Sequence, residues 1–409
     1  MRPEPPTFAR LGRAPAGGRA LAGALVAVLC AIGPRTASAQ DSVSDVLSFL
    51  VTNQAVVTDD FVKDLEAAAA TRDTISRFLQ VELSALPIGS STGGFIYRLN
   101  PTLGTMERVS DSFGPFFLER AATSGRGQTS IGFTFRHSSF DELDGRNLRD
   151  GSLVTTANRL ANESQPFDVE QLTLRMDANT YTLFGSFGVT DRLDIGAAIP
   201  IVDLNLSGER LNHYRGSVLH QATGSAFVTG LADVAVRAKY NLLQARGGGV
   251  SAHADLRLPT GDEEQLLGSG KTTIRLAAIA SIERGRIGAH ARAGFSQGGA
   301  SDDVEFGGAV VVSAATRFNV VGEIFGRRLS ALARVTDSVA PHPITPNVAT
   351  TRLLPISMGT TTALALAGFK WNLTRTWLLN ANVLFPLTET GLTGSPTSSI
   401  AIDYTFDRR

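Results

Sequence analysis

Residues 250–295 read VSAHADLRLPTGDEEQLLGSGKTTIRLAAIASIERGRIGAHARAGF and contain three strand-like runs, one long gap and one tight turn. Side chains of a β-strand point alternately to its two faces. In the first run the apolar face is Val250, Ala252, Ala254, Leu256 and Leu258, and the polar face is Ser251, His253, Asp255 and Arg257. The next two runs repeat this alternation, with Arg275 in the second and His290 and Arg292 in the third on the polar face. The stretch therefore predicts neighbouring strands with one apolar and one polar surface.

The gaps between such runs alternate between short and long from about Gln128 to Phe406. The short gaps are 190–192, 244–248, 283–286, 315–318 and 374–376. The long gaps are 141–167, 207–222, 259–271, 297–303, 333–360 and 389–398. Tight turns at one end and longer loops at the other are typical of outer-membrane barrels. We therefore predict an all-β fold, an up-and-down transmembrane antiparallel β-barrel of roughly twelve strands, over residues 121–409.

The first 39 residues have the three parts of a secretory signal peptide. Arginines up to Arg19 precede an apolar run over 21–32, and Ala37-Ser38-Ala39 forms a cleavage site of the A-x-A type. The mature chain should begin at Gln40. Since Cys30 is the only cysteine, that mature chain would hold no disulfide and no thiolate metal site.

Composition narrows the class of protein further. No apolar run of about eighteen residues follows the signal, which excludes a helical membrane span. A closed barrel is the other structure that satisfies its backbone hydrogen bonds in lipid. The formal net charge is +0 and no polybasic segment occurs, so nucleic acid is not an expected partner. The expected partners are outer-membrane lipid, the barrel-assembly machinery and a small-molecule solute, and the expected location is the bacterial outer membrane.

Residues 40–120 do not alternate like a barrel and form a separate N-terminal segment. The apolar positions Phe61, Leu65, Ala68, Ile75, Leu79 and Leu83 recur at helical spacing. Asp59 and Asp60 precede them in the manner of an N-cap, and Pro87 ends the pattern. This short helical extension has three possible positions: over the periplasmic mouth, inside the lumen as a plug, or on the rim as an ordinary periplasmic helix.

Aromatic residues cluster near the end of the chain. Trp371 and Trp377, the only tryptophans, flank the short gap at 374–376. The last strand-like run carries Tyr404 and Phe406 on its apolar face. Interfacial belts of membrane proteins favour Trp and Tyr, so these four residues predict an interfacial girdle.

Charged and polar residues occupy the set that a barrel would turn inward. The lumen-facing candidates are Arg136, Arg175, Arg237, Lys239, His253, Asp255, Arg257, Arg275, His290, Arg292, Lys370 and Asp403. An inward charge costs little in a water-filled pore, whereas at the lipid midplane it costs roughly 2–4 kcal/mol. Either these residues form a slightly cationic ring that favours anions, or they pair across strands and fill a closed lumen. Twelve strands lie between the filled and open cases.

The sequence offers little for covalent chemistry. His137, His213, His220 and His342 lie near predicted loops, but no G-x-S-x-G motif accompanies them. We expect no catalytic, cofactor-binding or metal-binding residues. The leading hypothesis is a channel for passive passage of small solutes. The alternatives are a structural or surface-interaction barrel with a closed lumen and, third, an outer-membrane hydrolase.

Three stretches carry a family resemblance. They are FGVTDRLDIGAAIPIV (187–202), GLADVAVRAKYNLL (230–243) and LRLPTGDEEQLLGSGK (256–271). Together they resemble the bacterial outer-membrane proteins of the phenol-degradation (MetA-pathway) transporter family, over roughly residues 110–406. The resemblance implies a barrel channel for small, often hydrophobic or aromatic, compounds. It implies no particular functional residues.

Overall fold

The computed structural model describes residues 42–52, 62–84, 97–100, 105–108, 113–245, 247–299, 301–330, 334–356 and 359–406. The predicted signal peptide and the predicted N-cap at 59–60 lie outside these residues. Within the described ranges, no helix has the length and apolar character needed to cross a membrane.

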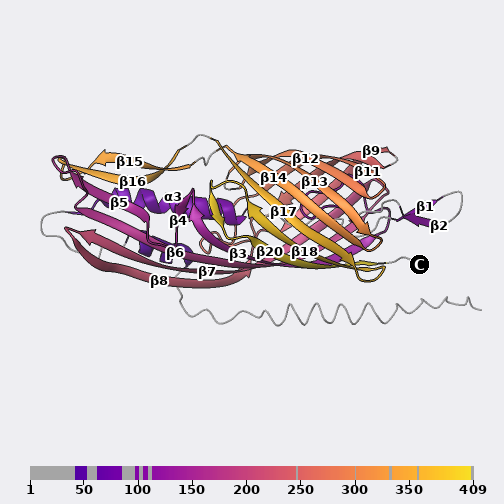
Figure 1. Ribbon diagram of the computed structural model, residues 1–409, viewed down its shortest axis with the longest axis horizontal. Helices are drawn as coiled ribbons and strands as arrows, with labels where there is room; N and C mark the ends of the chain where they lie inside the picture. Colours follow the sequence, from indigo (N-terminus) through magenta and orange to yellow (C-terminus); the bar gives the residue numbers. More distant parts are fainter. Residues whose placement is uncertain are drawn as a thin grey trace, which may run out of the picture. The chain divides into compact units, whose positions relative to one another are not determined.

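Twelve antiparallel strands form a closed barrel, which confirms the predicted fold class (Figure 1). The ring order is β3-β6-β7-β9-β10-β11-β12-β13-β14-β17-β18-β20, and β20 closes it by pairing with β3. These strands are β3 (Thr129–Leu143), β6 (Asp168–Gly188), β7 (Leu193–Tyr214), β9 (Ala235–Ala245), β10 (Gly248–Arg257), β11 (Thr273–Arg284), β12 (Ile287–Gly298), β13 (Asp303–Ala315), β14 (Phe318–Leu329), β17 (Thr360–Asn372), β18 (Trp377–Pro386) and β20 (Thr397–Phe406). All five predicted short gaps are turns between neighbouring wall strands.

The outer surface of the ring is a band of exposed apolar side chains. It includes Phe133, Ile195, Ile199, Val236, Leu256, Ile274, Phe295, Val310, Val320, Ile324, Phe385 and Ile400. The alternate residues of the same strands point inward, and many of them are polar and buried. An apolar exterior around a polar interior is the arrangement of a transmembrane barrel.

A second sheet continues from the barrel, because β6 and β7 run on beyond the ring (Figure 1). Its strand order is β15-β16-β5-β6-β7-β8, and we call it the extension. The additional strands are β5 (Leu153–Leu160), β8 (Ser217–Leu231), β15 (Arg334–Pro341) and β16 (Val348–Ile356), with the short β4 (Arg146–Asn147) and β19 (Leu392–Gly394) pairing with β3. A separate hairpin joins β1 (Tyr97–Asn100) and β2 (Thr105–Arg108).

The extension corrects the predicted long gaps. Residues 207–222 are not a loop, since β7 reaches Tyr214 and a tight turn at Arg215 and Gly216 leads into β8. The gap 141–167 holds β4 and β5, and the gap 333–360 holds β15 and β16. These strands alternate apolar and polar residues. Their many polar residues make the segments look like loops when only the sequence is known.

The polarity of the outward face changes at one level on three neighbouring strands. On β7 the outward residue is apolar up to Ile201 and polar from Asp203 to Glu209. On β6 the change falls between Tyr181 and Asn179, which pair directly with Ile201 and Asp203. On β3 the outward Phe135, opposite Tyr181, gives way to His137, whose Nδ1 lies 2.8 Å from Asn179 Oδ1. Three strands changing together mark the level at which lipid gives way to water.

The inward face of the extension is apolar and is covered by two helices. Helix α2 (Val43–Thr52) packs on β7 and β8, and helix α3 (Leu65–Ser84) packs on β16 and β5. Their buried residues join those of the sheet in one cluster, which includes Leu47, Leu50, Ile75, Leu79, Leu172, Leu174, Leu204 and Leu206. The extension is therefore built like a water-soluble sheet with its own core, whereas the barrel wall has the opposite arrangement.

Candidate functional site: the occupied interior of the barrel

Residues 113–124, which we call the strap, lie inside the barrel. The carboxylate of Glu323 on β14 accepts hydrogen bonds from the backbone N–H groups of Phe116, Phe117 (3.1 Å) and Leu118 (3.0 Å). The backbone groups of the wall strands already pair with one another. The N–H groups of the irregular strap are therefore bound by a wall side chain. A buried backbone amide left without a partner would cost about 1–3 kcal/mol.

Further wall strands hold the strap from other directions. Lys370 of β17 donates to the Pro115 carbonyl oxygen at 2.7 Å. Asn241 of β9 donates to the Ala121 carbonyl oxygen at 2.9 Å, and Ser281 Oγ on β11 accepts from the Ala121 N–H at 2.8 Å. A segment bonded to inward residues of several strands around the ring must occupy the lumen.

Apolar contacts complete the seat of the strap. Phe116 is buried against four inward-facing side chains, Val311, Val321, Leu366 and Leu384. Phe117 packs on Phe325 of β14, with ring centroids 5.9 Å apart. The Nζ of Lys370 lies 4.9 Å from the centre of the Phe116 ring, a cation–π distance.

Most predicted lumen-facing residues lie on the inward face. Arg136, Lys239, His253, Asp255, Arg257, His290, Lys370 and Asp403 are buried, and Arg237, Arg275 and Arg292 are half-buried. Arg175 differs: it is exposed on β6 between the buried Leu174 and Met176. Arg175 lies in the extension, where the outward face of the sheet is polar, so its side chain points outward to water and not into the lumen.

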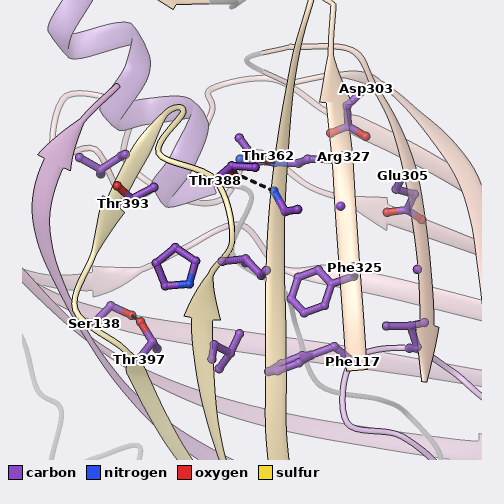
Figure 2. Close-up of a pocket in the computed structure, with 18 of the residues that line it drawn as sticks. Phe117, Ser138, Asp303, Glu305, Phe325, Arg327, Thr362, Thr388, Thr393 and Thr397 are labelled. Carbon is purple, nitrogen blue, oxygen red and sulfur yellow. Dashed lines mark hydrogen bonds between the residues drawn. The ribbon is translucent and has the colours of Figure 1, made fainter. Parts of the chain in front are cut away.

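A cavity of about 190 Å³ remains between the strap and the wall. Its lining includes Phe117, Leu118 and Glu119 of the strap, inward residues of β13, β14, β17 and β18, and several residues of the segment 386–397. Figure 2 shows Phe117 and Phe325 together at one end, with Arg327 and Asp303 towards the other. The cavity thus has an aromatic end and a charged end.

The charged end is a network of shared ion pairs. Arg237 Nε lies 2.9 Å from Asp255 Oδ2. Glu305 forms ion pairs with two arginines: Arg292 Nη2 donates to one carboxylate oxygen at 2.7 Å, and Arg275 Nε lies 3.2 Å from the other. These side chains come from neighbouring strands, and the barrel register brings them to one level.

Other predicted residues have local partners. His290 Nδ1 lies 2.9 Å from Ser281 Oγ, and Asn380 donates to Asp403 at 2.7 Å. Both ring nitrogens of the buried His253 lack a hydrogen-bond partner among the described protein residues. Buried polar atoms of this kind are common positions for bound water.

The four predicted girdle residues lie together at one end of the barrel. Trp371 and Trp377 are exposed. The ring of Trp377 packs at a tilt on that of Tyr404, with centroids 4.9 Å apart, and Tyr404 meets Phe406 edge-on at 4.9 Å. A second aromatic group lies at the level where polarity changes. Phe133 and Phe135 there flank Tyr181, with centroids 6.4 and 5.3 Å away. The sequence analysis missed this second group because it lacks tryptophan.

A buried ion cluster fastens the helices to the extension. Lys63, just before α3, pairs with Glu170 and lies 3.6 Å from Asp168. Arg210 Nη1 lies 2.9 Å from Glu170 and donates to the Val51 carbonyl oxygen of α2 at 2.8 Å. The cluster joins both helices to β6 and β7 at a point where water does not reach.

No group of three His, Cys, Asp or Glu side chains that could hold a metal ion occurs among the described residues. The loop histidines have local roles: His220 lies 2.7 Å from Glu209, and His342 Nδ1 accepts from the N–H groups of Ile344 and Thr345. Neither arrangement places a nucleophile beside a base.

Lys239 and Lys370, which bind the strap, were predicted from the sequence, whereas the acidic residues Glu323 and Glu119 were not. Glu323 stands on the inward face of β14 between apolar neighbours, and Glu119 belongs to a segment without periodicity. The available signal was an acidic residue on an otherwise apolar inward set, since a buried carboxylate needs a partner.

No protein-family model and no curated protein matches the chain. Among solved structures it is similar to the COG4313 outer membrane channel from Pseudomonas putida F1, at 13% identity and a TM-score of 0.45 over 70% of this chain and 98% of that one. It is also similar to the transport unit of the autotransporter AIDA-I from Escherichia coli, at 10% identity and a TM-score of 0.39 over 68% and 90%. A third is the KdgM porin in complex with disordered oligogalacturonate, at 8% and 0.37 over 68% and 99%. At these values the function of this chain must follow from its own residues.

Proposed function

We propose that this chain is an outer-membrane channel for passive passage of small solutes, and that the strap and the two helices regulate it. The main support for this proposal is the nature of the segment that fills the lumen. Its occupant is a separate segment of chain, held by side chains such as Glu323 and Lys370, and it leaves a cavity rather than a continuous packed core. A filling of this kind can move without unfolding the wall.

The same proposal covers how the chain is targeted and divided into segments. Residues 1–39 would be removed as a signal peptide, 40–120 would form the N-terminal helical segment, periplasmic or plug, and 121–409 the barrel, delivered to outer-membrane lipid by the barrel-assembly machinery. The wall itself begins at β3 (Thr129–Leu143), so the strap crosses the proposed boundary at 120. The resemblance to the phenol-degradation transporter family adds hydrophobic or aromatic compounds as the finer hypothesis for the solute.

The closed, structural barrel is favoured by one observation, the occupied lumen. Conductance separates the two functions. The mature chain is inserted into planar lipid bilayers, and the same preparation is tested for swelling of liposomes in small neutral and anionic solutes. A channel should give discrete current steps, rare at rest because the strap blocks the lumen. A barrel that gives no steps at any voltage, and no swelling, is structural.

A further inference from the structure

The cavity beside the strap has two chemically different walls. Its apolar wall includes Phe117, Phe325, Leu364 and Leu384, from the strap and three neighbouring strands. Its other wall carries Arg237, Arg275 and Arg292 of β9, β11 and β12. Arg136 of β3 and Arg327 of β14, two residues from Phe325, also line the cavity. A molecule that satisfies both walls needs a compact apolar body and a polar group at one end.

The net charge of the cavity lining indicates whether the polar group of a bound molecule should be an anion or a cation. Among the described residues that line the cavity, five are arginines and four are carboxylates, Glu119, Asp255, Asp303 and Glu305, so this described set carries one positive charge in excess. Glu119 is also shared with Lys239 at 3.0 Å, which lies outside the cavity. An added anion would neutralise this excess, whereas an added cation would increase it at a poorly solvated place.

The geometry of the arginines favours a carboxylate in particular. Arg275 and Arg292 both point at Glu305, one at each oxygen. Each guanidinium has five N–H donors in a planar fork, so two of them beside a single carboxylate retain donors for a second. Arg–carboxylate contacts are bidentate and charge-assisted, which makes them stronger than neutral hydrogen bonds.

The volume limits the size of the apolar body. An engineered apolar cavity of about 150 Å³ binds benzene. The cavity here, at about 190 Å³, exceeds that by the space of a small polar group. The ring-to-ring contact of Phe117 with Phe325 at 5.9 Å provides an aromatic surface for such a body.

We propose that this cavity binds a small carboxylate with a compact apolar body, its apolar part against Phe117 and Phe325 and its carboxylate on Arg275 and Arg292. The proposal rests on the proposed function for its meaning, since the bound molecule would be a solute resting on its path through the lumen. Binding itself can be measured without transport.

The test is calorimetric titration of the mature chain in lipid nanodiscs, so that no detergent competes for the cavity. Three probes of equal size are compared: benzoate, benzyl alcohol and benzylammonium. We expect saturable binding of benzoate, with benzyl alcohol at least about tenfold weaker and benzylammonium giving no saturation. Equal affinity for benzyl alcohol, or no saturable heat with benzoate at millimolar concentration, would overturn the proposal.

Variants locate the site. Arg292→Gln should weaken benzoate binding about tenfold or more, and Arg275→Lys, which keeps the charge but loses the fork, should weaken it less. Arg375→Gln, at the exposed turn between β17 and β18, is the matched control and should change nothing. Folding of each variant is checked by its heat-dependent gel mobility. If a folded Arg292→Gln and a folded Arg275→Lys both bind benzoate as the parent does, the carboxylate site is refuted. Current steps recorded from the same preparation report on the channel function separately.

Discussion

The Nζ atom of Lys239 lies 3.0 Å from the Oε2 atom of Glu119, and both side chains are buried. Lys239 belongs to the barrel wall and Glu119 to the strap, so each neutralises a charge that the other element places inside the barrel. Removing one partner of such a pair leaves an uncompensated buried charge, at a cost of about 3–5 kcal/mol. The strap is thus part of the electrostatic balance of the wall.

Replacing Glu323 by alanine should release the strap. The backbone N–H groups of Phe116, Phe117 and Leu118 would lose their common acceptor, at about 1–3 kcal/mol for each amide that stays unpaired. Single-channel recording should show more frequent or larger current steps than in the parent. Glu163→Ala, in the turn after β5, is the control. Unchanged currents in a folded Glu323→Ala barrel would mean that the strap does not limit conductance.

The change in outward polarity along β7 predicts that an added charge destabilises the barrel strongly at one position and little at another on the same face. Ile199→Arg places a charge in the apolar band and should destabilise the folded barrel by roughly 2–4 kcal/mol. Asn205→Arg, six residues further along the same face, should change stability by less than about 1 kcal/mol, because that face meets water. Urea unfolding in lipid vesicles measures both. Equal losses at the two sites would contradict the level assigned to the lipid boundary.

Arg210 should be essential to the extension and dispensable to the barrel. Arg210→Leu leaves Glu170 with only Lys63 and removes the bond to the Val51 carbonyl, for a loss of about 3–5 kcal/mol. Hydrogen exchange should rise in α2 and β5 and stay low in β10 to β13. The exposed Arg159→Leu should leave the exchange pattern as it is. If exchange in α2 does not respond to Arg210→Leu, the ion cluster does not hold the helix.

Gly208 leaves the room that α2 occupies. A Cβ atom added there would lie 2.7 Å from Leu50 Cδ1 and 2.8 Å from the Thr173 carbonyl oxygen. Gly208→Ala should therefore destabilise the docking of α2 by about 1–3 kcal/mol, seen as earlier thermal loss of helical circular dichroism. Gly322→Ala, whose Cβ would meet nothing within 4 Å, is the matched control. Identical melting of the two variants would mean that α2 can adjust without cost.

Turn length and the alternation of apolar and polar residues were enough to predict the strands of the barrel wall. The turns at 190–192 and 374–376 are short, and the alternation beside them places Trp371 and Trp377 on the exposed face, where the structure has them. Turn length and alternation are properties of neighbouring residues, so they can be read without knowing the rest of the fold.

Alternation does not reveal which face is wet, and this explains what the sequence analysis missed. In LTLRMDAN (172–179) the apolar set points inward, the reverse of the barrel wall, so the rule that the polar set faces the lumen predicts the wrong side for Arg175. The strap gave no pattern at all, because its backbone bonds go to side chains such as Glu323, 207 residues away from Phe116. Such partners emerge only once the ring has closed.

Because β6 and β7 run on unbroken beyond the ring, one side of the described barrel projects further than the other. From Asp203 to the turn at Arg215, β7 advances at about 3.4 Å per residue, which at a typical barrel tilt amounts to a height of roughly 30 Å. One side of the barrel would then project from the bilayer by about the thickness of the hydrocarbon layer, while the opposite side ends near the lipid. Seen by electron microscopy or scanned by atomic force in a flat membrane, single particles should be lopsided, with the tall side marked by an antibody against the β7–β8 turn.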